Sequence, residues 1–340
     1  MSLRREVSCS DRIGRRQFLT SGAAAVAVSA AGRARAADSP KRVGVLVGSP
    51  QTKPSEDKVF RDDINRGFAA QGWTESHIDL DYHYGNNDPT LNDKLARDLV
   101  ALRPDVLLGF NTIGTAALVK ATRDLPIVFA HVSDPVGMKF VKSFANPGGN
   151  VTGFSNFEAS MGGKWLELLK LIAPKLTRVR MIANPAMLSG LFYVPAFREA
   201  AGRLGLEFGV VEVHDLSEVE ATVAEAASAP GTGLVFSSDG YVYSMYDPII
   251  AAVNARGVPA MYPFRQYPLT GGLVAYSVNE DALYEGAAEY AGRILNGARP
   301  ADLPVQGPSK FDLIINLGTA AAQGLTVPPE LLIAATQVIE

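Results

Sequence analysis

The stretch DVLLGFNTIGTAALVKATRDLPIVFAH, residues 105–131, contains a complete strand–helix–strand pattern. Residues 105–110 and 126–131 are short apolar runs of the kind found in strands that are buried on both faces. The segment 112–122 between them is predicted to be a helix. Buried strands that alternate with helices through short connections predict a parallel sheet covered by helices.

The same alternation continues on both sides of this stretch. Toward the N-terminus, apolar runs and helical stripes predict two strands and two helices, at 42–47, 60–71, 79–84 and 91–102. After the turn Pro147-Gly148-Gly149-Asn150 the rhythm restarts. The later elements are predicted at 161–172, 178–183, 194–204, 207–213, 219–227, 233–236, 259–263, 271–276, 283–294 and 310–316.

These elements predict two doubly wound α/β lobes of similar size. Residues 37–153 are assigned to the first lobe, to which part of 264–340 returns. Residues 154–263 are assigned to the second lobe, with a C-terminal segment contributing to it. Because no long Gly/Ser linker separates the lobes, we expect direct hinge strand crossings between them rather than a flexible tether.

The first 36 residues differ from the rest of the chain. This segment contains seven arginines and only two acidic residues, which gives it a net charge of +5. An uncharged run over 18–32 follows the Arg15-Arg16 pair, and Ala34-Arg35-Ala36 has small residues where a signal peptidase cuts. We expect a cleaved export signal of the twin-arginine type, with the general export route as the alternative, and therefore a periplasmic protein.

Charge and cysteine content exclude two classes of protein. Subtracting the +5 of the signal from the −3 of the 340-residue chain leaves −8, which argues against a nucleic-acid-binding face. Cys9 is the only cysteine of the chain and lies within the signal. A disulfide framework is therefore excluded for the mature protein, and its stability must come from packing.

Short polar side chains follow the predicted strands in both halves of the chain. In open parallel sheets ligands bind beyond the carboxyl ends of the strands, so we predict that these residues line a solute site. Each of them could instead serve only as a helix cap. The predicted ligand-binding residues are Ser49, Asn111, Thr112, Asp134, Ser155, Asn184 and Asp239.

Three tyrosines are added to this set because their rings could stack on an aromatic or apolar solute. They are Tyr241, Tyr262 and Tyr276, all in the second half of the chain. The alternative is that these rings pack between loop and core with their hydroxyls hydrogen-bonded.

Signatures of catalysis are missing from the sequence. Four dispersed histidines form no pair at metal-ligand spacing, and neither a phosphate loop, a dinucleotide fingerprint nor a G-x-S-x-G elbow is present. We therefore expect no catalytic residues, no metal and no cofactor. An acid/base pair of Asp134 and Asp239 in a secreted hydrolase or isomerase is kept as an alternative.

Several motifs together resemble the ABC transporter substrate-binding proteins of the tryptophan/tyrosine type across nearly the whole chain. The motifs that carry the resemblance are Pro126-Ile-Val-Phe129, Asp134-Pro135-Val136, Pro147-Gly-Gly-Asn-Val-Thr-Gly153, Lys164-Trp-Leu-Glu-Leu-Leu169, Tyr290-Ala-Gly-Arg-Ile-Leu-Asn-Gly297, Pro300-Ala-Asp-Leu-Pro304, Lys310-Phe-Asp-Leu-Ile-Ile-Asn-Leu317 and Gly324-Leu-Thr-Val-Pro-Pro329. The resemblance implies a type I periplasmic-binding fold, with three hinge crossings and closure of the lobes over the ligand. Asn111 replaces the glycine that usually precedes Thr112 in that family.

The resulting functional hypothesis is a solute receptor of an ABC importer. It is expected to capture a small amino-acid-like or aromatic solute between its lobes, to be a monomer, and to meet the permease and ATPase subunits transiently. Its alternatives are a periplasmic sensor that docks on a signalling receptor, and the secreted enzyme described above.

Overall fold

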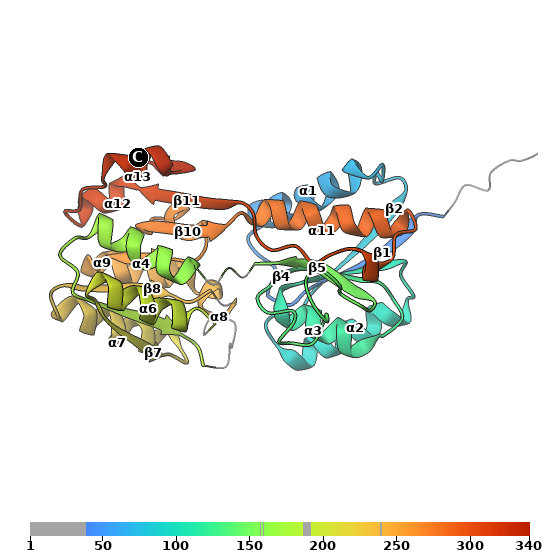
Figure 1. Ribbon diagram of the computed structural model, residues 1–340, viewed down its shortest axis with the longest axis horizontal. Helices are drawn as coiled ribbons and strands as arrows, with labels where there is room; N and C mark the ends of the chain where they lie inside the picture. Colours follow the sequence, from blue (N-terminus) through green and yellow to red (C-terminus); the bar gives the residue numbers. More distant parts are fainter. Residues whose placement is uncertain (1–38, 157, 159, 186–191, 239) are drawn as a thin grey trace, which may run out of the picture. The chain divides into compact units, whose positions relative to one another are not determined.

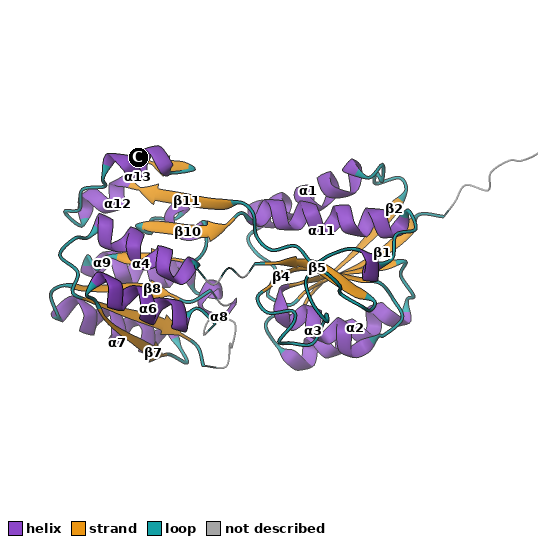
Figure 2. Ribbon diagram, viewed as in Figure 1, coloured by secondary structure: helices purple, strands orange, loops and turns teal. Residues whose placement is uncertain are grey.

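The structure is a computed structural model that describes residues 39–340 except 157, 159, 186–191 and 239 (Figure 1). The predicted export signal and Asp239 lie outside the described residues. Residues Pro40–Glu340 group as one unit that contains two separate β-sheets. Strands and helices alternate along the chain, and Figure 2 shows helices (purple) around the strands (orange) of each sheet. This arrangement confirms the prediction of two α/β lobes.

The first sheet is parallel throughout and has the strand order β2-β1-β3-β4-β5. Its central strands are continuous apolar runs, such as 106–110, in which every residue is buried. Helices cover such a sheet because both faces are apolar. The elements of this lobe are β1 (Lys41–Val47), α1 (Pro54–Ala70), β2 (Ile78–Tyr84), α2 (Pro89–Ala101), β3 (Val106–Phe110), α3 (Asn111–Ala121), β4 (Ile127–Val132), β5 (Val151–Ser155) and α11 (Glu280–Leu295).

The second sheet has the order β12-β11-β10-β9-β8-β6-β7 and is parallel except between β10 and β11. The antiparallel pair arises where the chain returns to this sheet after α11. The remaining elements are α4 (Met161–Ile172), β6 (Arg178–Ala183), α6 (Val194–Leu204), β7 (Glu207–Glu212), α7 (Leu216–Ser228), β8 (Thr232–Phe236), α8 (Gly240–Ser244), α9 (Tyr246–Arg256), β9 (Ala260–Tyr262), α10 (Gln266–Leu269), β10 (Val274–Val278), η1 (Pro300–Asp302), β11 (Phe311–Asn316), α12 (Leu317–Ala322), α13 (Pro329–Ala334) and β12 (Gln337–Ile339).

The chain passes between the two sheets three times: after β5, between β10 and α11, and between η1 and β11. The middle passage brings α11 from the second sheet onto the first lobe, where it packs along α1. Figure 1 shows the two helices side by side, α1 in blue and α11 in orange. Segments far apart in the sequence therefore complete one lobe together.

Local signals explain where the main helices begin and end. Asp88, Asp215 and Asn279 accept hydrogen bonds from backbone N–H groups at the first turns of α2, α7 and α11. Gly205 and Gly257 end α6 and α9 in the left-handed conformation that favours glycine. None of the described helices is both long and apolar enough to span a bilayer.

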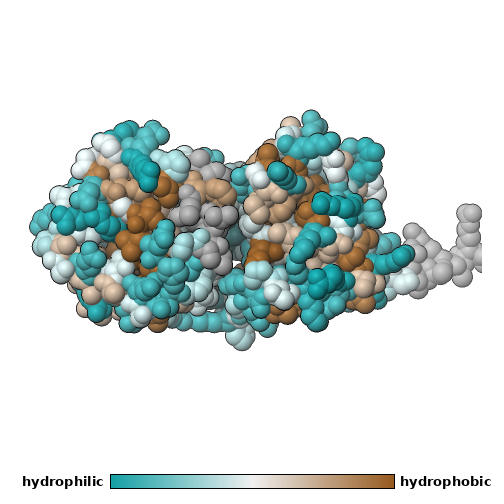
Figure 3. All heavy atoms as spheres, turned by 90° about the horizontal axis from the view of Figure 1, so that it is seen from below, coloured by the Kyte–Doolittle hydropathy of each residue, from teal (hydrophilic) through white to brown (hydrophobic). Residues whose placement is uncertain are grey.

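Apolar side chains gather inside the lobes. Trp165 of α4 is fully buried, and its indole N–H donates to the backbone oxygen of Tyr276 at 2.5 Å. On the face shown in Figure 3, hydrophilic residues predominate and the hydrophobic patches between them are small. Burial of apolar side chains such as Trp165 is the kind of interaction that drives folding.

Close packing of α1 against α11 depends on Gly67. A Cβ at this position would overlap the carbonyl oxygen of Glu285 and the side chain of Ala288, both on α11. The overlap is with backbone, so neither helix can relieve it by a rotamer change. Glycine at this position sets the distance between the two helices.

We predict that Gly67→Ala lowers the free energy of unfolding by about 1–3 kcal/mol, because the added methyl pushes α11 away from α1. Gly202→Ala is the matched control, since Gly202 lies inside α6 with nothing within 4 Å of an added Cβ. That control should be neutral or gain up to about 1 kcal/mol. Urea denaturation followed by circular dichroism measures both, and equal stability of the two variants would contradict the prediction.

Candidate functional site

The backbone is strained at the carboxyl edge of the first sheet. Asn86 and Asn87 after β2, Asn111 after β3 and His131 in β4 all have positive φ angles, between 54° and 62°. These strands are close neighbours in the order β2-β1-β3-β4. Non-glycine residues in this conformation cluster at functional sites, because the strain persists only where the surroundings impose it. This edge is therefore the candidate site.

Asn111 and Ser49 lie at the ends of two neighbouring strands, β3 and β1. The Asn111 side-chain oxygen accepts a hydrogen bond from the Gly114 backbone N–H at 3.1 Å and so caps α3. A Cβ on Gly48 would overlap the same oxygen, so glycine there lets the asparagine approach β1. Thr112 follows in the first turn of α3 and is half-buried.

His131 occupies an irregularity in β4. The pairing of β4 with β5 shifts register between Ala130 and Val132, and this shift includes His131. Its imidazole Nε2 lies 3.1 Å from the Glu280 carboxylate at the start of α11, and both side chains are largely buried. Its ring centroid lies 5.9 Å from that of Phe264, which follows β9 of the other lobe. His131 thus contacts residues from two distant parts of the chain, α11 and the segment after β9.

Aromatic side chains of the second lobe surround this point. The ring of Tyr243 in α8 packs edge-on against Phe264, with centroids 5.0 Å apart, and also contacts Tyr246 at 5.5 Å. Burial raises the pKa of the Tyr243 hydroxyl well above its usual range, and the nearby carboxylates of Glu280 and Glu56 add to this effect. Tyr243 is therefore uncharged at neutral pH and lies close to carboxylates of the first lobe.

Direct polar contacts join the two lobes beside this cluster. The Tyr246 hydroxyl donates to Glu56 at 3.0 Å, and the Lys53 ammonium pairs with Asp247 at 2.8 Å. The Asn87 amide donates to the Gly240 carbonyl at 3.4 Å. These bonds connect the loops after strands of the first sheet and the start of α1 with α8 and α9. The candidate site therefore lies where the strand ends of both lobes meet.

Two other predicted polar residues, Asp134 and Ser155, make contacts within the first lobe. The Asp134 carboxylate accepts from the Gly137 backbone N–H at 2.8 Å, which fixes a turn. The buried Ser155 hydroxyl donates to the Ser133 carbonyl at 3.3 Å. Asn184 is buried at the end of β6, and Asp239 lies outside the described residues.

The three predicted tyrosines do not gather at one place. Tyr262 is fully buried in the core, stacked between Tyr267 at 4.6 Å and Phe236 at 5.2 Å, because β9 is an interior strand. This placement corrects the expectation that it faces a solute. The hydroxyl of Tyr241 donates to the carbonyl of His214, which lies in the same lobe.

Tyr276 lines a separate surface pocket of about 520 Å³ between α4, α6 and the start of β11. Its ring stacks on Phe311 with centroids 5.6 Å apart. Glu158 and Ser160, which follow the first passage between the sheets, also line this pocket. Tyr276 is therefore assigned to this pocket and not to the cluster around His131.

Sequence reasoning missed His131, Phe264 and Glu280. The sequence does not reveal the placement of His131, since a register shift leaves no signal in a single sequence. Glu280 follows the Asn279 cap, where an acidic residue is explained by the helix dipole alone. Phe264 directly follows the predicted strand 259–263, and its position at a strand end was the one available signal.

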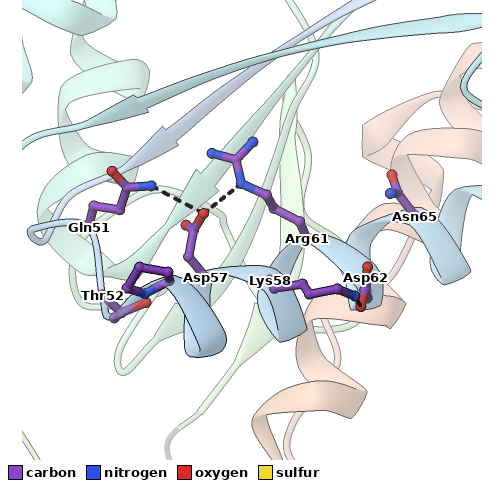
Figure 4. Close-up of a pocket in the computed structure, with 8 residues that line it drawn as sticks. Gln51, Thr52, Asp57, Lys58, Arg61, Asp62 and Asn65 are labelled. Carbon is purple, nitrogen blue, oxygen red and sulfur yellow. Dashed lines mark hydrogen bonds and ion pairs between the residues drawn. The ribbon is translucent and has the colours of Figure 1, made fainter.

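A second pocket of about 450 Å³ lies at the first turns of α1 (Figure 4). At its centre the Asp57 carboxylate accepts hydrogen bonds from Gln51 at 3.1 Å, from Arg61 at 2.7 Å and from the Tyr84 hydroxyl. Burial opposes ionisation of Asp57, but these three donors outweigh it and lower its pKa. Burial and the adjacent Asp57 charge raise the pKa of Tyr84 to about 12. This network holds the loop after β1 against α1.

A buried carboxylate lies beneath the start of α11. Asp63 of α1 is fully buried and forms an ion pair with Arg66. Burial, together with the negative charges of Asp281 and Glu285, raises the pKa of Asp63 to about 6. Asp281 is held in turn by Arg265 of the second lobe at 2.8 Å. The position of α11 thus depends on charges of both lobes.

Among the residues that the structure describes, no group of three His, Asp or Glu side chains could hold a metal ion. The described groups around His131 offer hydrogen bonds, one carboxylate and aromatic faces. Such an arrangement suits reversible binding of a small organic solute.

Comparisons with known proteins agree with this geometry. The sequence profile of the family described as ABC transporter substrate binding protein matches residues 45–339. The chain belongs to this family. The assignment confirms the resemblance inferred from the motifs, and members of this family are solute receptors and not enzymes.

Individual relatives and solved structures match most of the chain. A tyrosine-binding protein from Clostridioides difficile (strain R20291) is 27% identical over 287 residues, 84% of this chain and 82% of that protein. A Streptococcus pneumoniae ABC domain in complex with L-Trp has a TM-score of 0.80 and 26% identity, covering 88% of this chain and 100% of that one. A conserved domain protein from Vibrio cholerae has a TM-score of 0.79 and 29% identity, covering 88% and 99%.

The raised pKa of Asp63 predicts a pH dependence of stability. The folded-state pKa of about 6 exceeds the reference value of 3.8, so the folded state binds more protons between these pH values. The free energy of unfolding should therefore lose about 1–2 kcal/mol as pH rises from about 4 to about 6. Asp63→Asn should remove this loss and be the more stable protein above pH 6.

Denaturation in urea from pH 4 to 8 measures the effect. Asp62→Asn is the matched control, because Asp62 lies on the same helix with a largely exposed side chain that pairs with Lys58. Parallel pH profiles for wild type and Asp63→Asn would contradict the assignment.

Proposed function

We propose that the protein is the extracytoplasmic receptor of an ABC importer and captures an amino-acid-like or aromatic solute between its lobes. The proposal rests on one observation: His131 at the end of β4 contacts both Glu280 and Phe264, and Phe264 belongs to the other lobe. Two relatives support the solute class, since their descriptions name tyrosine and L-Trp.

The chemistry of the cluster suits such a solute. Phe264 and Tyr243 offer aromatic surface, and aromatic pairs contribute about 0.5–1.5 kcal/mol beyond the area that they bury. Ser49, Asn111 and Thr112 at the edge of the first sheet remain proposed polar contacts, together with the N–H groups that open α3. The rings of His131 and Phe264 now contact each other, so a solute ring would enter as the lobes separate.

Closure of the lobes would give the transporter a signal to recognise. The bonds of Tyr246 to Glu56 and of Lys53 to Asp247 form only when the lobes approach each other. A solute that contacts both lobes shifts the population toward this closed form. The permease would bind the closed receptor transiently, and the ATPase would act through the permease.

The location of the receptor outside the cytoplasm follows from the sequence. The arginine-rich segment over residues 1–36 ends in a signal-peptidase pattern, which we assign to export with cleavage. We propose that the mature protein is a periplasmic monomer without cofactor.

Titration calorimetry with L-tryptophan and L-tyrosine tests the proposal directly. A solute present at one hundred times its dissociation constant should also stabilise the protein by about 2.7 kcal/mol in a thermal-shift assay. X-ray scattering at saturation should show a smaller radius of gyration than without solute. Failure of every aromatic solute to bind would reject the proposed solute class.

Phe264→Ala should weaken binding of an aromatic solute by roughly tenfold, because the variant loses a stacking face. Phe311→Ala is the control, since Phe311 also stacks on a tyrosine but lines the other pocket. Its affinity should equal that of wild type. Circular dichroism of Phe264→Leu, which keeps most of the volume, separates lost binding from lost folding.

A further inference from the structure

A series of hydrogen bonds connects Ser133, Asn156 and His131 with the Glu280 carboxylate. The buried Ser133 hydroxyl donates to the Asn156 side-chain oxygen at 3.2 Å. The amide nitrogen of Asn156 therefore points to His131, at 3.3 Å from Nδ1 and 3.4 Å from Nε2. Nε2 also faces the Glu280 carboxylate, which only accepts hydrogen bonds, so we place a ring hydrogen on Nε2 and let Nδ1 accept from Asn156. That hydrogen then points at the Glu280 carboxylate, 3.1 Å away.

This arrangement gives Glu280 a fixed orientation but no full countercharge. Its side chain is only 14% exposed, and burying a carboxylate without a cation is costly. Within the described part of the chain no lysine or arginine forms an ion pair with it. The nearby Arg265 is held by Asp281 at 2.8 Å instead. A cation that arrives with the solute would supply the missing partner.

Aromatic rings lie directly beside this carboxylate. His131 contacts both Glu280 and the ring of Phe264, and Tyr243 packs edge-on against the same phenylalanine. A solute that carries a ring and a cationic nitrogen a few bonds apart would match the two features at once. The Asp134 carboxylate is occupied by its own turn.

We propose that Glu280 receives the ammonium group of the solute and that Ser133, Asn156 and His131 act as positioning residues that orient it. The inference deepens the proposed function and rests on it. It assigns the solute to the aromatic amines, of which aromatic α-amino acids are one class, and excludes aromatic carboxylic acids that lack an amino group.

The strained backbone of His131 fits this role. A φ of 62° in a strand costs energy for a residue other than glycine, so the surroundings must enforce it. The register shift between β4 and β5 places the histidine between Asn156 of one strand end and Glu280 of α11. If β4 and β5 paired without this shift, the His131 side chain would point to the face of the sheet that the strict alternation along β4 gives it.

Three solutes separate the contributions of the ammonium group and of the carboxylate to binding. They are L-tryptophan, tryptamine, which lacks the carboxylate, and indole-3-propionate, which lacks the ammonium group. Calorimetry should show that wild type binds L-tryptophan at least tenfold more tightly than indole-3-propionate. Glu280→Gln should weaken L-tryptophan and tryptamine by roughly 10- to 100-fold and change indole-3-propionate by less than about threefold.

Glu285→Gln is the matched control, because Glu285 lies farther along α11 and pairs with Arg66. It should keep the solute preference of wild type. Equal binding of L-tryptophan and indole-3-propionate by wild type would overturn the inference while leaving the proposed aromatic solute intact. Binding of none of the three would overturn both.

The positioning role of His131 is tested by a pair of variants. His131→Leu should lower the L-tryptophan affinity about tenfold, since it removes the donor to Glu280. His131→Gln should restore most of it, because its amide N–H can donate to the same carboxylate. Leucine and glutamine both have to adopt the same strained backbone at this position. If His131 had a purely structural role, the two variants would therefore bind L-tryptophan with equal affinity, and that result would overturn the assignment.

Discussion

The contact of α1 with α11 is the constraint on which the candidate site depends. Gly67 allows the backbone of α11 to approach α1, and Arg265 of the second lobe holds Asp281 in the first turn of α11. That first turn carries Glu280. A helix that enters the first lobe from the second sheet thereby brings a carboxylate to the end of β4, where His131 meets it.

The architecture was largely predictable because buried strands and amphipathic helices leave strong periodic signals. The runs at 42–47 and 105–110 give β1 and β3 almost to the residue. Elements without such a signal were missed. They include β5, whose glycine and polar residues hide its strand character, the helix α9, and short elements such as α8, α12, α13 and β12. The antiparallel pairing of β11 depends on where the chain returns, which no local pattern records.

The site was less predictable, and the reason is physical. A polar residue at a strand end can cap its own helix or face a solute, and sequence alone does not separate the two. Asn111 caps α3 and still lies at the strained edge, whereas Asp134 fixes a turn. Tyr262 and Tyr276 share a residue type with Tyr243, but their strands direct them into the core and into another pocket.

The three passages of the chain between the sheets also bear on how the protein forms. The first lobe cannot be completed from 41–156 alone, because α11 covers part of its core and is made after β10. Contacts between α1 and α11 therefore span more than two hundred positions of sequence. Non-local closure of this kind slows folding and leaves apolar surface of a partly formed lobe exposed during synthesis. The helix that carries Glu280 to the candidate site is thus also the last α-helix needed to complete the N-terminal lobe.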